Sequence, residues 1–279
     1  MSSGILYVVA TPIGNLDDIS RRAIDILSKV ELVAAEDTRH TRKLLAHLGI
    51  DKALLSLHEH NERDRVAGIL DKLQSGQSIA LVSDAGTPLI SDPGYPLVAA
   101  CRRAKFPVIP VPGVSAVITA LSVSGLPTDS FRFCGFPPRQ SGKRQDVFQS
   151  LAKETATLVF YESSHRIVAC LEDAESVFGS DRKACVAREL TKLYETVKTD
   201  SLGSLLSWVK ADENQQKGEF VLMIEGLGQS NESESSTIDT EVLLKALLEE
   251  LPVKKAAAIT AKLSGHKKND LYKRALELK

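Results

Sequence analysis

Two acids and two arginines stand within seven residues of one another in the first quarter of the chain, as Glu36, Asp37, Arg39 and Arg42. A carboxylate can take a proton from a reacting group, and a guanidinium group can bind a phosphate. The ordinary alternative is a helix start, with Asp37 as the N-cap and the acids facing the positive end of the helix dipole. A cap accounts for one carboxylate only, so the cluster is a candidate for chemistry.

A second candidate is the segment SDAGTPLISDPG at residues 83–94, which follows the apolar run at residues 79–82. Prolines and glycines fix the shape of such a loop and let a ligand approach the backbone closely. The segment contains neither a P-loop nor a G-x-G-x-x-G pattern, so it does not predict a phosphate ligand. The loops at residues 11–15 and 112–116 also contain Gly and Pro and also follow apolar runs.

These four loops need a sheet to position them. Short apolar runs alternate with stretches of helical spacing, and the runs are residues 5–9, 32–35, 79–82, 108–111, 158–161, 184–187 and 220–224. Residues 18–30 and 63–73 place their apolar side chains on one face of a helix. The alternation predicts an α/β fold with sheets covered on both faces. Ligands of such sheets bind beyond the carboxyl ends of the strands, so the loops are expected to form the rim of one cleft.

The chain divides into four parts. Residues 131–136 begin a second series of strands, in which residues 195–199 are expected to pair with the strand near Val186. The polar, Ser-rich segment after Glu225 has the composition of a linker, and residues 252–279 carry eight Lys or Arg against two acids. We predict two α/β domains at residues 1–114 and 115–228, a linker at 229–240, and a basic module of short helices, similar to a helix-turn-helix, at 241–279.

Composition restricts the class of protein. The 279 residues have a formal net charge of −1, so a nucleic-acid partner would need a local basic patch. The four cysteines are scattered without a C-x-x-C pattern, which predicts reduced thiols and not a zinc or redox site. No basic region precedes the first apolar run, and no run is long enough to span a membrane. We therefore expect a cytoplasmic protein.

Two further patterns carry little weight. Gly226 and Gly228 follow an apolar run, but a dinucleotide fingerprint needs a third glycine and a helix, and a polar segment follows instead. His58, Glu59 and His60 offer imidazole and carboxylate groups, yet no third ligand follows at a spacing that zinc sites use. We expect no metal, and we interpret residues 58–62 as a polar wall of the cleft.

Eight ordered segments resemble the small-subunit ribosomal RNA methyltransferases of the tetrapyrrole (precorrin) methylase family, which use S-adenosylmethionine. The segments are VATPIGNL, AAEDTRHTRKLL, HEHNE, SDAGTPLISDPG, VPGVSA, FYESSHR, ARELTKLYE and GEFVLMIEG, and the basic tail is similar to the family's C-terminal helical module. The resemblance implies two α/β domains with the cofactor between them, usually in a homodimer. It also implies 2′-O-methylation of cytidine 1402 in 16S rRNA, at the decoding centre of the small ribosomal subunit.

The resemblance assigns residues to roles as well. It implies a cofactor pocket lined by Pro12, Asp84, Gly86, Thr87, Ile90, Ser91, Ser115, Ala116, Tyr161 and Ala187. A ribose hydroxyl is a poor nucleophile until it loses a proton, and the expected acceptor is Asp37 or Glu36, with His58 and Glu59 as other rim candidates. The expected RNA contacts are exposed cations, namely Arg39, Arg42, Arg139, Lys143, Arg144, Lys254, Lys255, Lys267 and Lys268.

Two other functions stay open at this point. A methyltransferase of the same fold could act on a tetrapyrrole or another small molecule, but it would have no need of the basic tail. A non-catalytic rRNA-binding assembly factor could keep the cleft as an inactive pocket. Such a factor would not bind S-adenosylmethionine tightly, which separates it from both enzymes.

Overall fold

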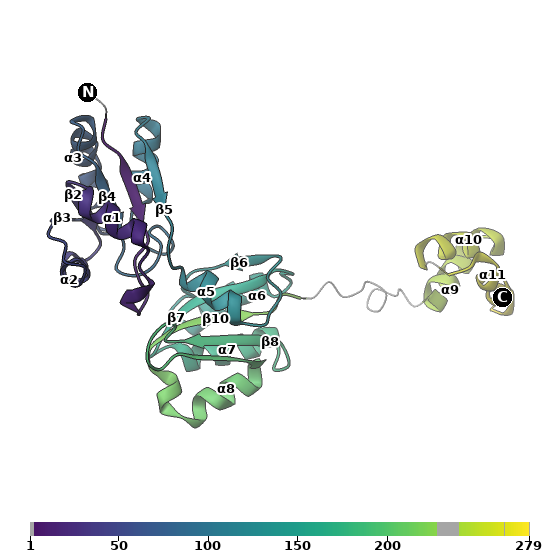
Figure 1. Cartoon of the computed structure of the whole chain (residues 1–279). Coiled ribbons are helices and arrows are strands. Elements are labelled where there is room, and N and C mark those ends of the chain that lie inside the picture. The colour runs from purple at the N-terminus through teal and green to yellow at the C-terminus, as the bar shows by residue number, and fades with distance from the viewer. Residues whose placement is uncertain (1–2, 228–239, 265, 279) are drawn as a thin grey trace. The chain divides into compact units, whose positions relative to one another are not determined.

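Five parallel strands form the first sheet, in the order β3-β2-β4-β1-β5 (Figure 1). The computed structural model describes residues 3–227, 240–264 and 266–278. The chain separates into two compact units, Met1–Gly226 and Leu227–Lys279, and each is described by itself. The strands of the first sheet are β1 (Leu6–Val9), β2 (Leu32–Ala35), β3 (Ala53–Ser56), β4 (Ile79–Val82) and β5 (Val108–Val111).

Helices cover both faces of this sheet. They are α1 (Arg21–Lys29), which follows the short 3-10 helix η1 (Leu16–Asp18), and α2 (Thr38–His47), α3 (Glu62–Gln74) and α4 (Tyr95–Arg103). Because side chains alternate along a strand, Leu6 and Leu81 pack in the core that contains α3 and α4. Their strand neighbours Val9 and Val82 pack in the core that contains α1 and α2. Both faces of the sheet are therefore covered by apolar packing, so polar loops lie at the ends of its strands.

The second sheet is mixed, in the order β6-β7-β10-β8-β9, with only β6 and β7 parallel. Its strands are β6 (Phe131–Phe133), β7 (Thr157–Ser163), β8 (Lys183–Arg188), β9 (Thr196–Ser201) and β10 (Glu219–Ile224). Helices α6 (Ser141–Leu151), α7 (Ile167–Phe178) and α8 (Leu202–Ala211) pack on one face, and α8 is followed by η2 (Glu213–Gln216). Helix α5 (Ala116–Val123) packs on the other face. It begins directly after the last loop of the first sheet, so it connects the two sheets.

The C-terminal unit contains three short helices, α9 (Thr240–Glu250), α10 (Val253–Ser264) and α11 (Lys268–Glu277) (Figure 1). Pro252 separates the first two, and its carbonyl accepts hydrogen bonds from the amides of Lys255 and Ala256 at the start of α10. Leu244, Leu271 and three small residues form a core of their own. The lysines predicted to contact RNA lie outside this core, because the buried faces of α10 and α11 consist of Ala, Thr and Leu.

The predicted α/β fold is confirmed. Each of the seven apolar runs forms a strand, and the pairing expected near Val186 is present, because Val186 stands opposite Lys198 of β9. Strand β3 was not predicted. The predicted linker lies outside the described residues except for Thr240, which begins α9, and the boundary between residues 114 and 115 stays a prediction.

No helix within the described ranges is long and apolar enough to cross a bilayer. All four cysteines are free thiols, and three of them are buried.

Candidate active site

Loops from three parallel strands are tied together at the carboxyl edge of the first sheet. The loops after β1 and β4 are joined by two backbone hydrogen bonds. The amide of Thr11 donates to the carbonyl of Gly86 (2.9 Å), and the amide of Gly86 donates to the carbonyl of Thr11 (3.0 Å). In the loop after β5, the carbonyl of Val114 accepts a hydrogen bond from the hydroxyl of Thr87 (3.0 Å). Parallel strands bring their carboxyl ends to one edge, and these bonds fix the loops there as a single structure.

The loop at residues 83–94 has an unusual backbone. Gly86, Leu89 and Ser91 have φ angles of 81°, 74° and 68°, which are strained for the two residues that carry a Cβ atom. A Cβ on Gly86 would stand 3.3 Å from a methyl group of Ile13. Gly86 therefore gives the loop a left-handed turn in a crowded position, and the strain at Leu89 and Ser91 is of the kind found where a loop holds a ligand.

A cavity of about 360 Å3 opens between this loop and the second sheet, within the range of about 300–1,000 Å3 that small-molecule sites occupy. Nine of the ten residues predicted for a cofactor pocket line it, and they are Asp84, Gly86, Thr87, Ile90, Ser91, Ser115, Ala116, Tyr161 and Ala187. The tenth, Pro12, is buried beside the cavity and does not line it. The resemblance assigned the ten residues to one pocket from three loops and two strands, and nine of them lie around one cavity.

The charged residues that line the cavity are all acids. They are Glu36, Asp84, Asp92, Glu162 and Glu219, and no Lys or Arg stands among the lining residues within the described part of the chain. Glu162 pairs with Arg166 (3.0 Å) and Glu219 with Lys192 (2.8 Å), both from outside the lining, so the uncompensated negative charge comes from the other three acids. Such a lining repels phosphate groups and attracts cations. The cavity is therefore suited to a small ligand of neutral or positive charge and not to a nucleoside phosphate.

Two of these carboxyl groups have raised pKa values. Burial, with a smaller contribution from the charge of Asp84, raises the pKa of Glu36. Burial also raises the pKa of Asp92 to about 6, and the charges of Glu36 and Asp84 contribute to this rise. A carboxyl group with a pKa near neutrality can accept and release a proton under physiological conditions.

Asp37 stands next to this cluster but does not line the cavity. Its side chain caps α2 by accepting from the amide of Arg39 (2.8 Å), and it also forms an ion pair with the guanidinium group of Arg39 (2.8 Å). These hydrogen bonds lower the pKa of Asp37 well below its usual range, which makes it a weak base. The alternative that the sequence offered, an N-cap of the helix, is therefore correct for Asp37. The guanidinium group of Arg39 is already paired with this carboxylate.

The predicted RNA contacts fall into two groups. Arg144 is 3% exposed, and its guanidinium group donates to the carboxylate of Asp173 (2.7 Å) and to three carbonyl oxygens. The prediction that Arg144 contacts RNA is wrong, because this side chain is enclosed and its donors are occupied. The other predicted cations are exposed, and they are Arg39, Arg42, Arg139, Lys143, Lys254, Lys255, Lys267 and Lys268.

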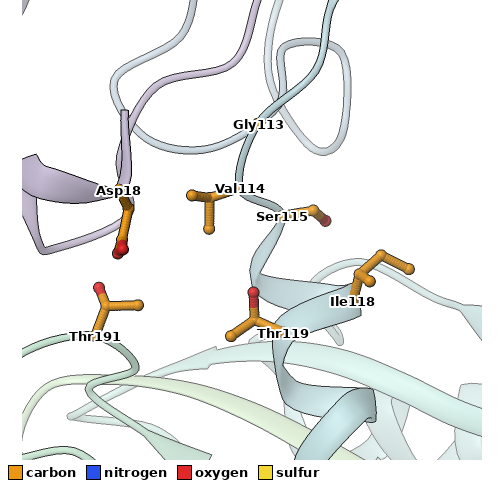
Figure 2. A pocket seen from close by; sticks show the side chains of 7 residues that line it. All are labelled: Asp18, Gly113, Val114, Ser115, Ile118, Thr119 and Thr191. Carbon is orange, nitrogen blue, oxygen red and sulfur yellow. The ribbon is translucent and has the colours of Figure 1, made fainter. Parts of the chain in front are cut away.

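A second hollow, of about 370 Å3, lies where α5 begins (Figure 2). Figure 2 shows Asp18 above Thr191 on one side of it, with Val114, Ser115, Ile118 and Thr119 on the other side. It shares Ser115 with the acidic cavity. Asp18 is its only charged lining residue within the described chain, and hydroxyl and methyl groups make up the rest. It offers no arrangement for catalysis.

Several lining residues were not predicted from the sequence. Asp92 lies in the same loop as the predicted Ser91, but its burial depends on the second sheet. Phe136 and Leu190 follow β6 and β8, and the position of a residue after a strand was the available signal for both. Among the described residues, no group of three or more His, Cys, Asp or Glu side chains is arranged to hold a metal.

Fold and cavity together define a two-sheet α/β protein with a small-molecule site between its sheets, and comparison with known proteins identifies the class. The family model for Tetrapyrrole (Corrin/Porphyrin) Methylases matches residues 5–206, and the model for the RsmI C-terminal HTH domain matches residues 234–279. The chain belongs to the tetrapyrrole methylase family.

Close relatives cover nearly the whole chain. A protein of Escherichia coli O157:H7 named ribosomal RNA small subunit methyltransferase I is 53% identical over 99% of this chain and 96% of its own length. A protein of the same name from Pseudomonas aeruginosa is 49% identical over 99% of this chain and 98% of its own length. The solved structure of diphthine synthase has a TM-score of 0.60 at 16% identity, over 80% of this chain and 90% of that one, which supports the fold alone.

Proposed function

We propose that this chain is an S-adenosylmethionine-dependent methyltransferase that modifies 16S rRNA of the small ribosomal subunit. The observation that carries the proposal is the identity of 53% over nearly the full length of a relative with that named activity. The finer proposal is the 2′-hydroxyl of cytidine 1402 as the acceptor. It rests on the resemblance, as does the proposed homodimer, whereas the proposed cytoplasmic location rests on the apolar runs of the sequence, none of which predicts a signal peptide or a membrane span.

The acidic cavity supports the choice of cofactor. S-adenosylmethionine supplies an electrophilic methyl group on a cationic sulfur atom, and it carries no phosphate. Asp84, Gly86 and Thr87 would bind it with backbone groups and short side chains, in a loop whose shape is already fixed. The five carboxylates of the lining favour a cation, and they would favour the charged cofactor over its neutral thioether product. The loop at residues 83–94 lacks a phosphate-binding pattern because the proposed ligand does not need one.

A carboxylate of the cavity would accept the proton of the attacking hydroxyl group. The geometry supports Asp92 better than Asp37, because Asp92 lines the cavity and burial raises its pKa to about 6, whereas the ion pair with Arg39 lowers the pKa of Asp37. Glu36 stands beside Asp92 in the lining, and its charge contributes to the raised pKa of Asp92. We therefore propose Asp92 as the proton acceptor, with Glu36 as the residue that adjusts it.

The alternatives are weaker on specific grounds. A small-molecule substrate leaves the exposed lysines of the C-terminal unit without a purpose. A non-catalytic assembly factor does not account for a cavity with five carboxylates and a strained, glycine-dependent loop. Calorimetry with S-adenosylmethionine separates the non-catalytic factor, because an inactive pocket would give no tight binding.

The decisive experiment follows the methyl group. Small ribosomal subunits that lack the modification are incubated with the purified protein and S-adenosylmethionine labelled in its methyl group, and the labelled nucleotide is located in 16S rRNA. We expect one labelled nucleotide, cytidine 1402, resistant to alkaline cleavage on its 3′ side because its 2′-oxygen is blocked. Label on a base atom, or no label in spite of tight cofactor binding, would overturn the proposal.

A further inference from the structure

We propose that the ring of Phe136 is the surface on which an unstacked base of the RNA substrate lies during methylation. The inference rests on the proposed function and extends it to a residue that positions the acceptor. Phe136 is an aromatic residue at the edge of the acidic cavity, and its ring is 56% exposed although it is part of the cavity lining. An exposed aromatic ring in the lining of a cavity is available for contact with a ligand that enters it.

Phe136 belongs to a row of three aromatic rings. Its ring centroid lies 5.5 Å from that of Tyr161, with the two planes at 60°, and the ring centroid of Phe133 lies 4.8 Å from that of Tyr161. Phe133 and Tyr161 are partly buried against the second sheet. The contact with Tyr161 therefore restrains the ring of Phe136, and its exposed part is available for stacking with another planar group.

The backbone that follows Phe136 is held at three successive carbonyl groups. The guanidinium group of Arg166 donates to the carbonyl of Pro137. Arg144 donates to the carbonyls of Pro138 (3.2 Å) and Arg139 (3.3 Å). Both prolines also restrict the backbone. An aromatic platform that is held before the ligand arrives loses little entropy on binding.

The charges around Phe136 favour nucleic acid at this position. Arg139 and Lys143 are exposed, and neither forms an ion pair with any residue in the described ranges. They can bind the phosphates on either side of a nucleotide. The interior of the cavity is acidic, so it repels those phosphates and keeps the RNA backbone at the rim. An uncharged base at the rim meets Phe136.

A ribose hydroxyl enters a narrow cavity more easily when its nucleotide is separated from its neighbours. Single-stranded nucleotides are bound in this state by stacking on aromatic side chains, and the stacking tolerates any base. Phe136 supplies such a surface beside the site where the methyl group would be held. The choice of nucleotide would then come from the surrounding RNA and not from Phe136.

The test compares Phe136→Ala, Phe136→Leu and Phe136→Tyr in the full-length chain. The substrate is the unmodified small subunit, and S-adenosylmethionine affinity is measured separately by calorimetry. We expect Phe136→Ala and Phe136→Leu to raise the KM for the subunit by roughly ten- to a hundredfold, the effect of losing one stacked base. Phe136→Tyr keeps the ring and should restore the wild-type KM, whereas a merely apolar role would be kept by Leu. Cofactor affinity should not change.

Phe131 provides the matched control. It is 42% exposed, begins β6, and does not line the cavity, so Phe131→Ala should leave the KM for the subunit unchanged. A normal KM in Phe136→Ala overturns the inference, and so does a loss of cofactor affinity, which would place the ring against the adenine. A change in the dimer dissociation constant without a change in KM would assign the ring to a second copy. Failure of the wild-type protein to methylate the subunit would instead reject the proposed function.

Discussion

Asp37 and Asp92 show how two aspartates at the same edge of one sheet acquire opposite properties. Asp37 is partly exposed and hydrogen-bonded to Arg39, so its ionised form is stabilised and its pKa is lowered. Asp92 is partly buried beside Glu36 and Asp84, so its ionised form is destabilised and its pKa rises to about 6. The type of residue was visible in the sequence, but the shift was not, since it depends on which element covers each carboxylate.

This difference leads to a prediction for the dependence of activity on pH. A base works in its deprotonated form, so kcat/KM should rise as the pH increases through about 6, the pKa of Asp92 in the free enzyme. Asp92→Asn should remove this limb and lower turnover by roughly a hundredfold or more. Glu36→Gln removes a charge that raises the pKa of Asp92, so the limb should move to lower pH. Initial rates of methyl transfer between pH 5 and 8 provide the measurement.

Asp37→Asn is the control for this series. Asparagine also caps helices well, so α2 should stay intact while the charge is lost. We expect a rate and a pH profile close to those of the wild type. A loss of a hundredfold in Asp37→Asn, with a normal rate in Asp92→Asn, would return the role of base to the residue that the sequence first indicated.

At the scale of elements, Arg144 is the residue whose position was predicted wrongly from the sequence, because it is buried and not exposed. The segment at residues 137–145 has the composition of an exposed basic loop, but residues from Ser141 onward form α6. Arg144, Phe148 and Leu151 are its buried residues, and their spacing of four and three is that of one helix face. Periodicity could therefore have placed Arg144 inside. It could not have supplied Asp173, which comes from α7.

Other elements were predictable to different degrees. The strands β4 and β7 were found because their residues are buried and apolar in unbroken runs. Strand β3 was missed because it is a four-residue edge strand without a fully buried position, so its sequence lacks both a continuous apolar run and a strict alternation. The residues predicted for the cofactor pocket came from the resemblance, and nine of them line the cavity, whereas Phe136 was missed although it follows β6.

The pair of Arg144 and Asp173 predicts a large effect on stability. Burial alone would raise the pKa of Asp173, but hydrogen bonds from Gln145, Ser141 and Arg144 outweigh it and lower that pKa. Arg144→Met leaves a buried carboxylate without its partner, and we expect a loss of about 3–5 kcal/mol in the free energy of unfolding. Denaturant unfolding of the full-length protein measures it. Arg144→Met combined with Asp173→Leu should recover much of the loss, because no charge is then left unpaired.

The pair of Arg132 and Glu154 is a suitable control for that prediction. It joins two other segments through a single contact of 3.2 Å, and the Arg132 side chain is 58% exposed. Arg132→Met should cost less than about 1 kcal/mol, as for other surface pairs. Equal losses from Arg132→Met and Arg144→Met would contradict the proposal that Arg144 of α6 holds the backbone after Phe136.

At the scale of the whole molecule, the cavity of the first unit and the tail at residues 252–279 carry charges of opposite sign. The chain as a whole has a formal net charge of −1, and its cavity is lined by carboxylates. The tail at residues 252–279 carries eight Lys or Arg against two acids. A chain of nearly zero net charge can thus bind a cationic cofactor in one unit and attract polyanionic RNA with the other. We therefore propose that cofactor binding and RNA attraction are separate functions of the two units.

The final prediction tests this division by charge alone. Lys254, Lys255, Lys267 and Lys268 are exposed and outside the small core of their unit, so changing all four to Gln should not unfold it. Each lysine that neutralises a phosphate contributes roughly 0.7–0.9 to the slope of log affinity against log salt. The four changes should therefore reduce the slope for binding 16S rRNA by up to about 3, while calorimetry gives an unchanged affinity for S-adenosylmethionine. The same change at four exposed lysines of the first unit, Lys29, Lys72, Lys105 and Lys153, should leave the slope as it is. If both sets lower the slope equally, RNA senses the charge of the whole protein, and the C-terminal unit has no special part in binding.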